Sequence, residues 1–308
     1  PMSTELATGV GSPMTFIKER LNGNRLVGFA AVLLTYLVAG AAAWAVWMVF
    51  QDRPIIAVLV ADLVATVVVF GASRFFDNSS LYDPFWSVVP PLIAVAWWGD
   101  GQQGRQVAAL VAVWAWGLRL TWNWASGWSG LGHEDWRYVE LRGRHRGRYW
   151  AVSFGGIHLF PTAQVFLGCL PLWPIMNSTK VYALEDALAL LVLFGAIALE
   201  ATSDWQLRRF LKKETRKPFC EEGLWAWCRH PNYLGEIGFW VGLYLLGMAS
   251  NPGWWWSGVG ALSITLMFVF ISAPWLDARN LARRPGYAGY ILRTFSLLPW
   301  PPRQGRAS

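Results

Sequence analysis

Charged residues are scarce in this chain of 308 residues. Asp, Glu, Lys and Arg make up 15% of it, whereas a soluble domain carries about 25%. Hydrophobic residues make up 55%, and the 22 tryptophans suit a protein that meets bilayer interfaces, where tryptophan is enriched. The composition therefore indicates an integral membrane protein.

Cysteine is rare, and the familiar cofactor motifs are absent. Among the three cysteines, Cys220 and Cys228 stand near His230, but a fourth ligand at a zinc spacing is missing, so we expect no metal site. The sequence contains neither a GxGxxG nor a Walker motif, so any nucleotide site is not of the Rossmann type. Neither an internal repeat nor a separate soluble domain is evident.

Long apolar runs dominate what is present. A membrane-spanning helix needs about 20 apolar residues, and eight runs are candidates. They cover residues 28–50, 55–73, 85–98, 107–125, 152–176, 183–203, 234–250 and 254–276. The third is short and contains Pro90 and Pro91, so it can be bent or re-entrant. We predict an all-α membrane bundle of seven to eight transmembrane helices over residues 28–276, between a cytoplasmic N-terminal tail (1–27) and a C-terminal segment (277–308).

Basic residues are distributed unevenly between the loops. With both termini in the cytoplasm, 22 Lys and Arg residues fall on the cytoplasmic side, and only Arg53, Arg105 and Lys180 fall outside. A net charge of +7 can indicate nucleic acid, but membrane orientation explains its placement in short loops. We therefore expect no nucleic-acid partner, and we expect the chemistry to lie on the cytoplasmic side.

Polar residues gather where the sixth run ends. Glu200, Asp204 and Arg208 recur every four residues and so share one helix face, although Asp204 and Arg208 could simply form a surface ion pair. Lys212 continues this face as a basic one. Because Arg and Lys donate charge-assisted hydrogen bonds to phosphate, the face suits a phosphate-bearing ligand, and anionic lipid headgroups are the alternative.

The stretch Trp225–Glu236, WAWCRHPNYLGE, opens the seventh run. Pro231 suits the first turn of a helix, whose free N–H groups and positive dipole end favour an anion. Arg229 and Asn232 flank this proline, and we expect Asn232 to contact a ligand. Glu236 either contacts the ligand as well, or caps the helix, or neutralises Arg229.

Candidate catalytic groups stand at the third and fourth runs. If Asp83 is buried, its neutral form is favoured, and Asp83 or Tyr82 could then hydrogen-bond a substrate carbonyl and donate a proton. Alternatively, Asp83 caps the helix before Pro84. Arg119 lies inside the fourth run and needs a partner such as Asp83 or Glu200, in a pair that is either functional or purely structural.

Two further polar residues lie inside apolar runs. Asp62 stands near the middle of the second run without an obvious partner, and the sequence offers no function for it. His158 also stands in an apolar run, where we expect a hydrogen-bonded core residue rather than a catalyst.

Several motifs together resemble the steroid 5α-reductase-like superfamily, most closely its bacterial DUF1295 branch. They include EATSDWQLRRF from Glu200, GLWAWCRHPNYLGE up to Glu236, and RRPGYAGYILRTFSLLPW over Arg283–Trp300, within a resemblance that covers residues 78–300. The resemblance implies a helical-bundle reductase of the bacterial inner membrane that holds NADPH at its cytoplasmic end. Its substrate would be a lipid-like enone that enters from the bilayer.

The resemblance also implies roles for residues. The segment that matches Glu200–Lys212 and the Asn-aromatic-Leu-Gly-Glu element would contact the cofactor, and the C-terminal segment would close over it. The predicted cofactor-binding residues are Glu200, Asp204, Arg208, Lys212, Arg229, His230, Asn232, Tyr233, Glu236, Asp277, Tyr290 and Arg293. The predicted catalytic residues are Tyr82, Asp83 and Arg119.

The chain departs from the steroid enzymes in ways that leave alternatives open. Their Gln-Glu-Leu-Pro-Ser run is absent, Tyr82–Asp83 lies in its place, and Trp116 stands where they carry a catalytic tyrosine. Membrane methyltransferases of the isoprenylcysteine and phospholipid types share an Arg-His-Pro-x-Tyr element, so use of S-adenosylmethionine is the alternative. Five cations over Arg208–Arg216 favour a polyphosphate cofactor over this cationic one. A lipid-binding protein without catalytic activity is the third class.

Overall fold

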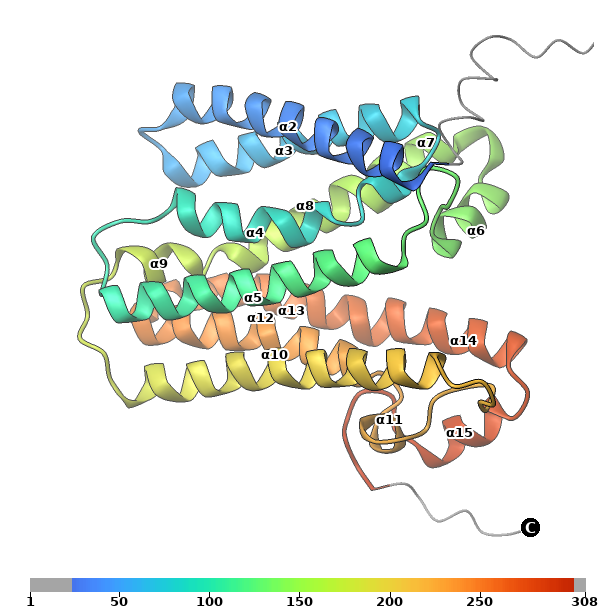
Figure 1. The fold of residues 1–308 in the computed structure, drawn as a ribbon. Helices are drawn as coiled ribbons and strands as arrows, with labels where there is room; N and C mark the ends of the chain where they lie inside the picture. The colour runs from blue at the N-terminus through green and yellow to red at the C-terminus, as the bar shows by residue number, and fades with distance from the viewer. Residues whose placement is uncertain (1–23, 302–308) are drawn as a thin grey trace, which may run out of the picture. The chain divides into compact units, whose positions relative to one another are not determined.

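The computed structural model describes residues 24–301, and their regular structure is helical (Figure 1). Within this range the only strand-like pairing is an isolated bridge between Cys228 and Phe295. The predicted all-α class is confirmed. Most of the predicted N-terminal tail, and residues 302–308 of the predicted C-terminal segment, lie outside the described residues.

Each predicted apolar run forms a helix or a continuous series of helices. In chain order these are α2 (Arg25–Phe50), α3 (Pro54–Phe75), α4 (Phe85–Ala96), α5 (Gln103–Gly127), the series from η2 (Arg146–Arg148) to α9 (Leu172–Asn177), α10 (Leu184–Leu211), α12 (Pro231–Ser250) and the series from η4 (Pro252–Ser257) to α14 (Ala273–Arg283). Shorter elements connect them.

Four of these segments are long and apolar enough to cross a membrane. They are Arg25–Phe50, Pro54–Phe75, Arg146–Asn177 and Pro252–Arg283. These helices indicate an integral membrane protein. By contrast, the 12 residues of α4 extend only about 18 Å at 1.5 Å per residue, which is shorter than a hydrocarbon core of about 30 Å. The count of seven to eight spans and the cytoplasmic termini stay predictions.

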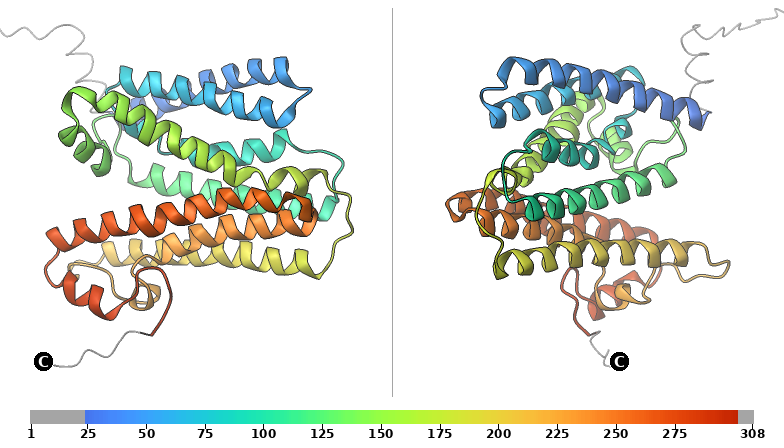
Figure 2. Two further views of the ribbon diagram at one scale, coloured as in Figure 1. Left: turned by 180° about the vertical axis from the view of Figure 1, so that it is seen from behind. Right: turned by 60° about the vertical axis from the view of Figure 1, so that its left-hand side comes forward.

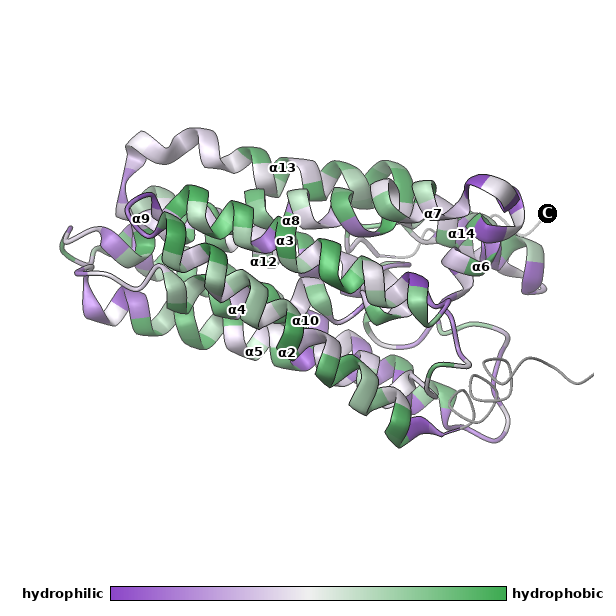
Figure 3. Ribbon diagram, turned by 90° about the horizontal axis from the view of Figure 1, so that it is seen from above, coloured by the Kyte–Doolittle hydropathy of each residue, from purple (hydrophilic) through white to green (hydrophobic). Residues whose placement is uncertain are grey.

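Hydrophobic and hydrophilic residues occupy different parts of the individual helices. Figure 3 shows hydrophobic residues along the middle of helices such as α3 and α4, and hydrophilic residues mainly at helix ends and in the connecting loops. Because lipid cannot hydrogen-bond the backbone, an apolar helix with polar ends is the arrangement that a bilayer favours.

The chain divides into two compact units. The first is formed by the residues up to Trp86 together with Trp122–Thr162, and the second by Ser87–Thr121 together with the residues from Ala163 onward.

The first unit contains the hairpin of α2 and α3, which pack against each other. Gly28 on α2 is needed for a close approach, since a Cβ there would lie 3.0 Å from the Cα of Gly130. Gly130 itself has φ of 112°, which favours glycine. The unit also holds η1 (Ser79–Leu81), α6 (Trp136–Arg144), α7 (Tyr149–Val152) and the π-helix η3 (Ser153–Leu159). It includes the first residues of α8 (Phe160–Cys169).

The second unit is organised around α10 and α12, which lie side by side in both views (Figures 1 and 2). Glycines on α12 allow this approach. A Cβ at Gly242 would lie 2.7 Å from Leu193 Cα, and a Cβ at Gly235 would lie 2.6 Å from Glu200 Cβ. The backbones therefore touch, and the second contact sets the position of a predicted site residue. The unit also contains α11 (Leu224–Trp227), α13 (Gly258–Met267) and α15 (Tyr287–Arg293).

Candidate functional site

A largely buried ionic cluster forms where α5 faces α10. Arg119 Nη2 lies 2.5 Å from Glu200 Oε1, and Arg119 Nη1 lies 2.5 Å from Asp204 Oδ2. The two acids are one helical turn apart on α10, as their spacing predicted, so a single guanidinium reaches both. Glu200 is one of the two partners expected for Arg119, and Asp204 is bound to Arg119.

Glu236 extends this cluster from the first turns of α12. The indole N–H of Trp116 donates to Glu236 Oε2 at 2.9 Å, and that of Trp240 donates to Oε1 at 2.8 Å. Trp116 also stacks on Phe239, with ring centroids 4.4 Å apart. Glu236 therefore does not neutralise Arg229. It is held by two indoles and lies close enough to Glu200 for the two carboxyl groups to interact.

Three buried atoms of this cluster make no hydrogen bond among the described residues: Arg119 Nε, Arg119 Nη2 and Glu200 Oε2. Nη2 is in the ion pair with Glu200 Oε1, which leaves Nε as a donor and Glu200 Oε2 as an acceptor. Leaving such a group unpaired costs about 1–3 kcal/mol, so partners from outside the chain are expected there. Trp116 and Trp240 were missed as site residues. Their signal was spacing, because Trp116 is one turn before Arg119 and Trp240 one turn after Glu236.

A second group of contacts ties the start of α12 to the C-terminal helices. The helix begins at Pro231, as predicted. Asp277 on α14 accepts hydrogen bonds from Arg229 Nη2 at 2.7 Å, from Tyr287 OH at 2.7 Å and from His230 Nε2 at 3.0 Å. The predicted cofactor residues Arg229, His230 and Asp277 are therefore brought together, but they are bound mainly to one another.

The other predicted residues of the C-terminal segment lie beside this group. Tyr290 OH donates to the Trp225 carbonyl, and the Tyr290 ring stacks on Phe219 with centroids 5.1 Å apart. Burial raises the pKa of the Tyr290 phenol, so this hydroxyl is a donor at neutral pH. Arg293 is paired with Glu221. The segment is thus anchored to the loop before α12 at several points.

Asn232 and Tyr233 stand in the first turn of α12. Asn232 is half-buried, and its amide makes no hydrogen bond within residues 24–301. The Tyr233 ring stacks on His230, with centroids 5.2 Å apart. The ligand contact of Asn232 therefore stays a prediction, while Tyr233 supports the loop.

The basic residues at and after the end of α10 differ in their exposure and in their ion pairs. Arg208 and Lys212 are exposed at the end of α10. However, Lys213 pairs with Glu222 at 2.6 Å and Lys217 with Glu221 at 2.5 Å. The acids of the same loop therefore neutralise part of the positive charge.

The predicted catalytic residues Tyr82 and Asp83 lie in the first unit, where their side chains make different contacts. Tyr82 OH bonds Thr162 Oγ1 at 2.8 Å, whereas Asp83 accepts a hydrogen bond from Tyr138 OH at 2.5 Å. Burial raises the pKa of Asp83 to about 7, although nearby Arg137 opposes this shift. Asp83 therefore has the character of an acid that titrates near neutral pH.

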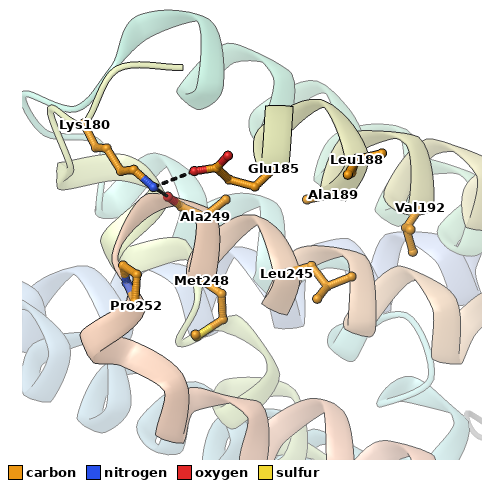
Figure 4. Close-up of a pocket in the computed structure, with 9 residues that line it drawn as sticks. All are labelled: Lys180, Glu185, Leu188, Ala189, Val192, Leu245, Met248, Ala249 and Pro252. Atoms are coloured by element: carbon orange, nitrogen blue, oxygen red, sulfur yellow. Dashed lines mark hydrogen bonds and ion pairs between the residues drawn. The ribbon is translucent and has the colours of Figure 1, made fainter. Parts of the chain in front are cut away.

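An open cavity of about 500 Å³ lies at the far end of α10 and α12 from the Arg119 cluster. Leu188, Val192 and Leu245 line it, and the ion pair of Lys180 with Glu185, 2.8 Å apart, stands at one end (Figure 4). Leu188 precedes Asp204 by 16 residues, or about 24 Å of helix. The cavity is thus separate from the candidate site. Among the described residues, no group of three or more His, Cys, Asp or Glu side chains could hold a metal ion.

Four helices that are long and apolar enough to cross a membrane indicate an integral membrane protein, and its second unit contains a cluster of acids around one arginine. The chain belongs to the DUF1295 family, described as a protein of unknown function, whose sequence model matches residues 69–294. This family is part of the steroid 5α-reductase-like superfamily. The predicted resemblance is confirmed.

One curated relative is an uncharacterized protein, C594.04c, of Schizosaccharomyces pombe. It is 24% identical over 230 residues, which cover 66% of this chain and 67% of that protein. No solved structure matches the chain.

Proposed function

We propose that the protein is an integral-membrane, NADPH-dependent reductase that saturates the C=C bond of a lipid-like enone. The observation that carries this proposal is the largely buried Arg119–Glu200–Asp204 cluster, in which Arg119 Nε and Glu200 Oε2 make no hydrogen bond among the described residues, at the end of α10 that also exposes Arg208 and Lys212. Membership of the steroid 5α-reductase-like superfamily supports it.

The side chains present fit a nucleotide cofactor. Glu200 Oε2 can accept from a ribose hydroxyl or a carboxamide N–H, and Arg119 Nε can donate to an oxygen. Arg208 and Lys212 can bind phosphate, and the Asn232 amide can donate and accept. NADPH, when bound, would supply the hydride. The chain's own residues would hold it, and the apolar helices would keep water away from it.

Asp83 is the acid that we assign to the substrate carbonyl. A carboxyl group with a pKa near 7 can donate to an oxygen that gains negative charge in the transition state. Tyr82 is the less suitable donor, because its hydroxyl is already bonded to Thr162. Arg119 would act by holding Glu200 and Asp204 in place.

Ligand titration tests the cofactor proposal. Thermal unfolding of the purified protein in detergent is followed with NADPH, NADH and S-adenosylmethionine. We expect NADPH to stabilise the protein, because a ligand that binds only the folded state adds stability in proportion to the logarithm of its concentration. The variant Asn232→Ala should weaken NADPH binding by about tenfold, the loss of about 1.4 kcal/mol from one polar contact. Lys180→Ala, at the other end of α10, is the control and should bind normally.

A specific observation supports a second candidate, a methyltransferase that uses S-adenosylmethionine. Arg119 pairs with the carboxyl groups of Glu200 and Asp204 and interacts electrostatically with a third, that of Glu236. An excess of acid suits a cationic ligand such as a sulfonium. Stabilisation by S-adenosylmethionine without any effect of NADPH would replace the reductase proposal with this one.

A further inference from the structure

A line of buried polar side chains runs along α3 in the first unit. Asp62, Thr66 and Ser73 lie on one face of α3, at spacings of four and seven residues, and all are buried. Ser153, His158 and Thr162 face them from η3 and α8, and they are buried too. Polar groups are costly inside an apolar bundle, so a continuous set of them needs an explanation beyond packing. We name this set, with Tyr82, Ser79 and Tyr149, the polar seam.

One end of the polar seam reaches the loop before α6. Glu134 Oε1 accepts from Tyr149 OH at 3.2 Å, and Tyr149 OH bonds Ser79 Oγ at 2.7 Å. Ser79 Oγ in turn bonds Ser153 Oγ at 3.0 Å. Glu134 is partly exposed and is paired with Arg142 at 3.1 Å. A hydrogen-bonded path therefore leads from a surface carboxylate into the buried start of η3.

His158 continues the path, and the π-helix places it there. Its Nδ1 lies 3.0 Å from the Ser153 carbonyl and 3.5 Å from Ser153 Oγ, while its Nε2 lies 3.1 Å from Ser73 Oγ. Because a carbonyl only accepts, Nδ1 carries the hydrogen and Nε2 accepts from Ser73. The wider turn of η3 sets this register, and π-helical turns are frequent at functional sites. A neutral imidazole that is hydrogen-bonded at both nitrogens can take up a proton at one nitrogen and release one from the other.

The inner end of the polar seam is a row of three hydroxyls. Tyr82 OH bonds Thr162 Oγ1 at 2.8 Å, and Thr162 Oγ1 bonds Thr66 Oγ1 at 2.8 Å. Three hydroxyls carry three hydrogens, but two bonds between them use only two. One hydrogen is therefore left over, either at an end of the row or on Thr162 if both neighbours donate to it, and it needs an acceptor.

Asp62 supplies an acceptor without a partner. Both of its carboxyl oxygens are buried and have no hydrogen bond within the described residues, and the side chain is 5% exposed. It lies one turn before Thr66 and interacts electrostatically with Tyr82. The titratable groups on the elements packed against α3 are Arg25 and Tyr36 on α2, Tyr82 after η1 and His158 on η3, and among residues 24–301 no cation pairs with Asp62.

The hydrogen-bonded path is interrupted twice, between His158 and Thr162 and between Thr66 and Asp62. Each interruption has the length that one bridging water spans. His158 and Thr162 are four residues apart, as are Asp62 and Thr66, and side chains at this spacing lie about 5–6 Å apart. Two hydrogen bonds through one water cover the same distance, and such bridges are ordinary in buried polar sites. The rings of Tyr82 and His158, whose centroids are 4.8 Å apart, lie beside the interruption between His158 and Thr162.

We propose that the polar seam is a proton path between Glu134 at the surface and Asp62 at the centre of α3. In each step a hydroxyl or water releases its hydrogen to the next oxygen as it accepts one from the previous oxygen. His158 takes up a proton at one ring nitrogen and releases one from the other. One proton moves over the whole path, and no other bond or electron pair is lost or gained. This inference rests on the contacts of the first unit and not on the reductase proposal.

The test follows the proton of Asp62 directly. The full-length protein is purified in detergent and deposited for infrared spectroscopy, and the medium is changed from H₂O to D₂O. The carbonyl stretch of a neutral carboxyl group shifts when its proton is replaced by deuterium. Asp62→Asn identifies which band belongs to Asp62, and the rate of its shift measures proton exchange with the surface.

Isosteric variants locate the path. Thr162→Val removes the central hydroxyl of the row, and we expect it to slow the exchange of Asp62 by at least about tenfold, since a lost bridging hydrogen bond raises the barrier by about 1.4 kcal/mol or more. Thr35→Val is the matched control, because Thr35 is also buried, but among the described residues its hydroxyl bonds only the Ala31 carbonyl of its own helix. Thermal unfolding shows whether both variants are folded, and Ser73→Ala repeats the test at the His158 contact.

The outcomes separate the proposal from a merely structural network. Rapid exchange in the wild type and in Thr35→Val, with slow exchange in Thr162→Val, supports the path. An Asp62 band that does not shift in D₂O shows an isolated acid and overturns it. Equal rates in all variants show that protons arrive by another route, and the lack of an Asp62 carboxyl band shows that the residue holds no proton. Either result overturns it too.

Discussion

Arg229 and Asp277, 48 residues apart in the sequence, form a two-point ion pair in which Arg229 Nη2 lies 2.7 Å and Nε 3.2 Å from Asp277 Oδ2. Arg229 also donates to the carbonyls of Ile291 and Thr294 at the end of α15. The Arg-His-Pro element is thus fixed between α14 and α15. Its arginine holds the C-terminal segment in place through contacts within the protein.

Replacing Asp277 should release this segment. Asp277→Asn removes the charge that Arg229 and His230 face, and we expect it to lower the free energy of unfolding by about 3 kcal/mol, as for other broken buried pairs. Trypsin should then cut faster after Arg283 and Arg293. Thermal unfolding and timed proteolysis measure the two effects.

Glu222→Gln is the control for this prediction. It also removes a carboxylate from an ion pair, but its partner Lys213 and Glu222 itself are largely exposed. Exposed pairs contribute about 0–1 kcal/mol, so stability and proteolysis should hardly change. Equal effects of the two variants would show that Asp277 has no special anchoring role.

The contact of α10 with α12 makes a second prediction. Gly242→Ala places a Cβ 2.7 Å from Leu193 Cα, so the helices must separate, and we expect a loss of about 1–3 kcal/mol as in other overpacked cores. Gly195→Ala on α10 is matched to it, because a Cβ there meets nothing within 4 Å. That variant should gain up to about 1 kcal/mol from better helix propensity. Thermal unfolding measures the stability of both variants. An unchanged stability of Gly242→Ala would contradict the close packing of α10 and α12.

The fully buried pair of Arg105 with Asp186 makes a third prediction. Arg105 Nε lies 2.6 Å from Asp186 Oδ1, and both side chains are 0% exposed. Arg105→Met leaves a buried carboxylate without a partner, and we expect a loss of about 3–5 kcal/mol. Asp186→Asn added to it removes the stranded charge while keeping an acceptor for the Ala183 N–H, so stability should partly recover. If the losses of the two single variants simply add in the double variant, the pair does not act as a unit.

Local sequence features predicted the helices well. Each apolar run became helix, and Pro231 marked the start of α12, because span length and the missing N–H of proline are properties of a short stretch. The ion pair of Arg119 with Glu200 was also foreseeable, since a buried guanidinium must find an acid. The number of membrane spans is a different matter, because hydropathy alone does not separate a spanning helix from a short buried one such as α4.

Contacts between distant segments were not predictable. Nothing in the spacing of Trp116 and Glu236 shows that their helices meet, and Asp277 gave no sign that Tyr287 and Arg229 would share its carboxylate. The polar seam was hidden for the same reason. Asp62 and His158 each looked isolated in an apolar run, and only the pairing of α3 with η3 brings them into one row.

Asp83 gives a prediction about pH. Burial raises its pKa from 3.8 to about 7 in the folded protein, so the folded state holds a proton there between about pH 4 and pH 7 that the unfolded chain has lost. The folded state binds more protons in this range, and its stability therefore falls as the pH rises from about 4 to 7 and changes little above that. Three pKa units limit this loss of stability to about 4 kcal/mol.

Asp83→Asn stays neutral and can still accept from Tyr138, so its unfolding temperature should vary less between pH 5 and pH 8 than that of the wild type. Asp77→Asn is the control, because Asp77 is an exposed acid paired with Arg142 at 2.9 Å, and it should keep the wild-type profile. A pH profile that is unchanged in Asp83→Asn would show that Asp83 is ionised throughout, and it would remove this residue as the proton donor of the proposed reaction.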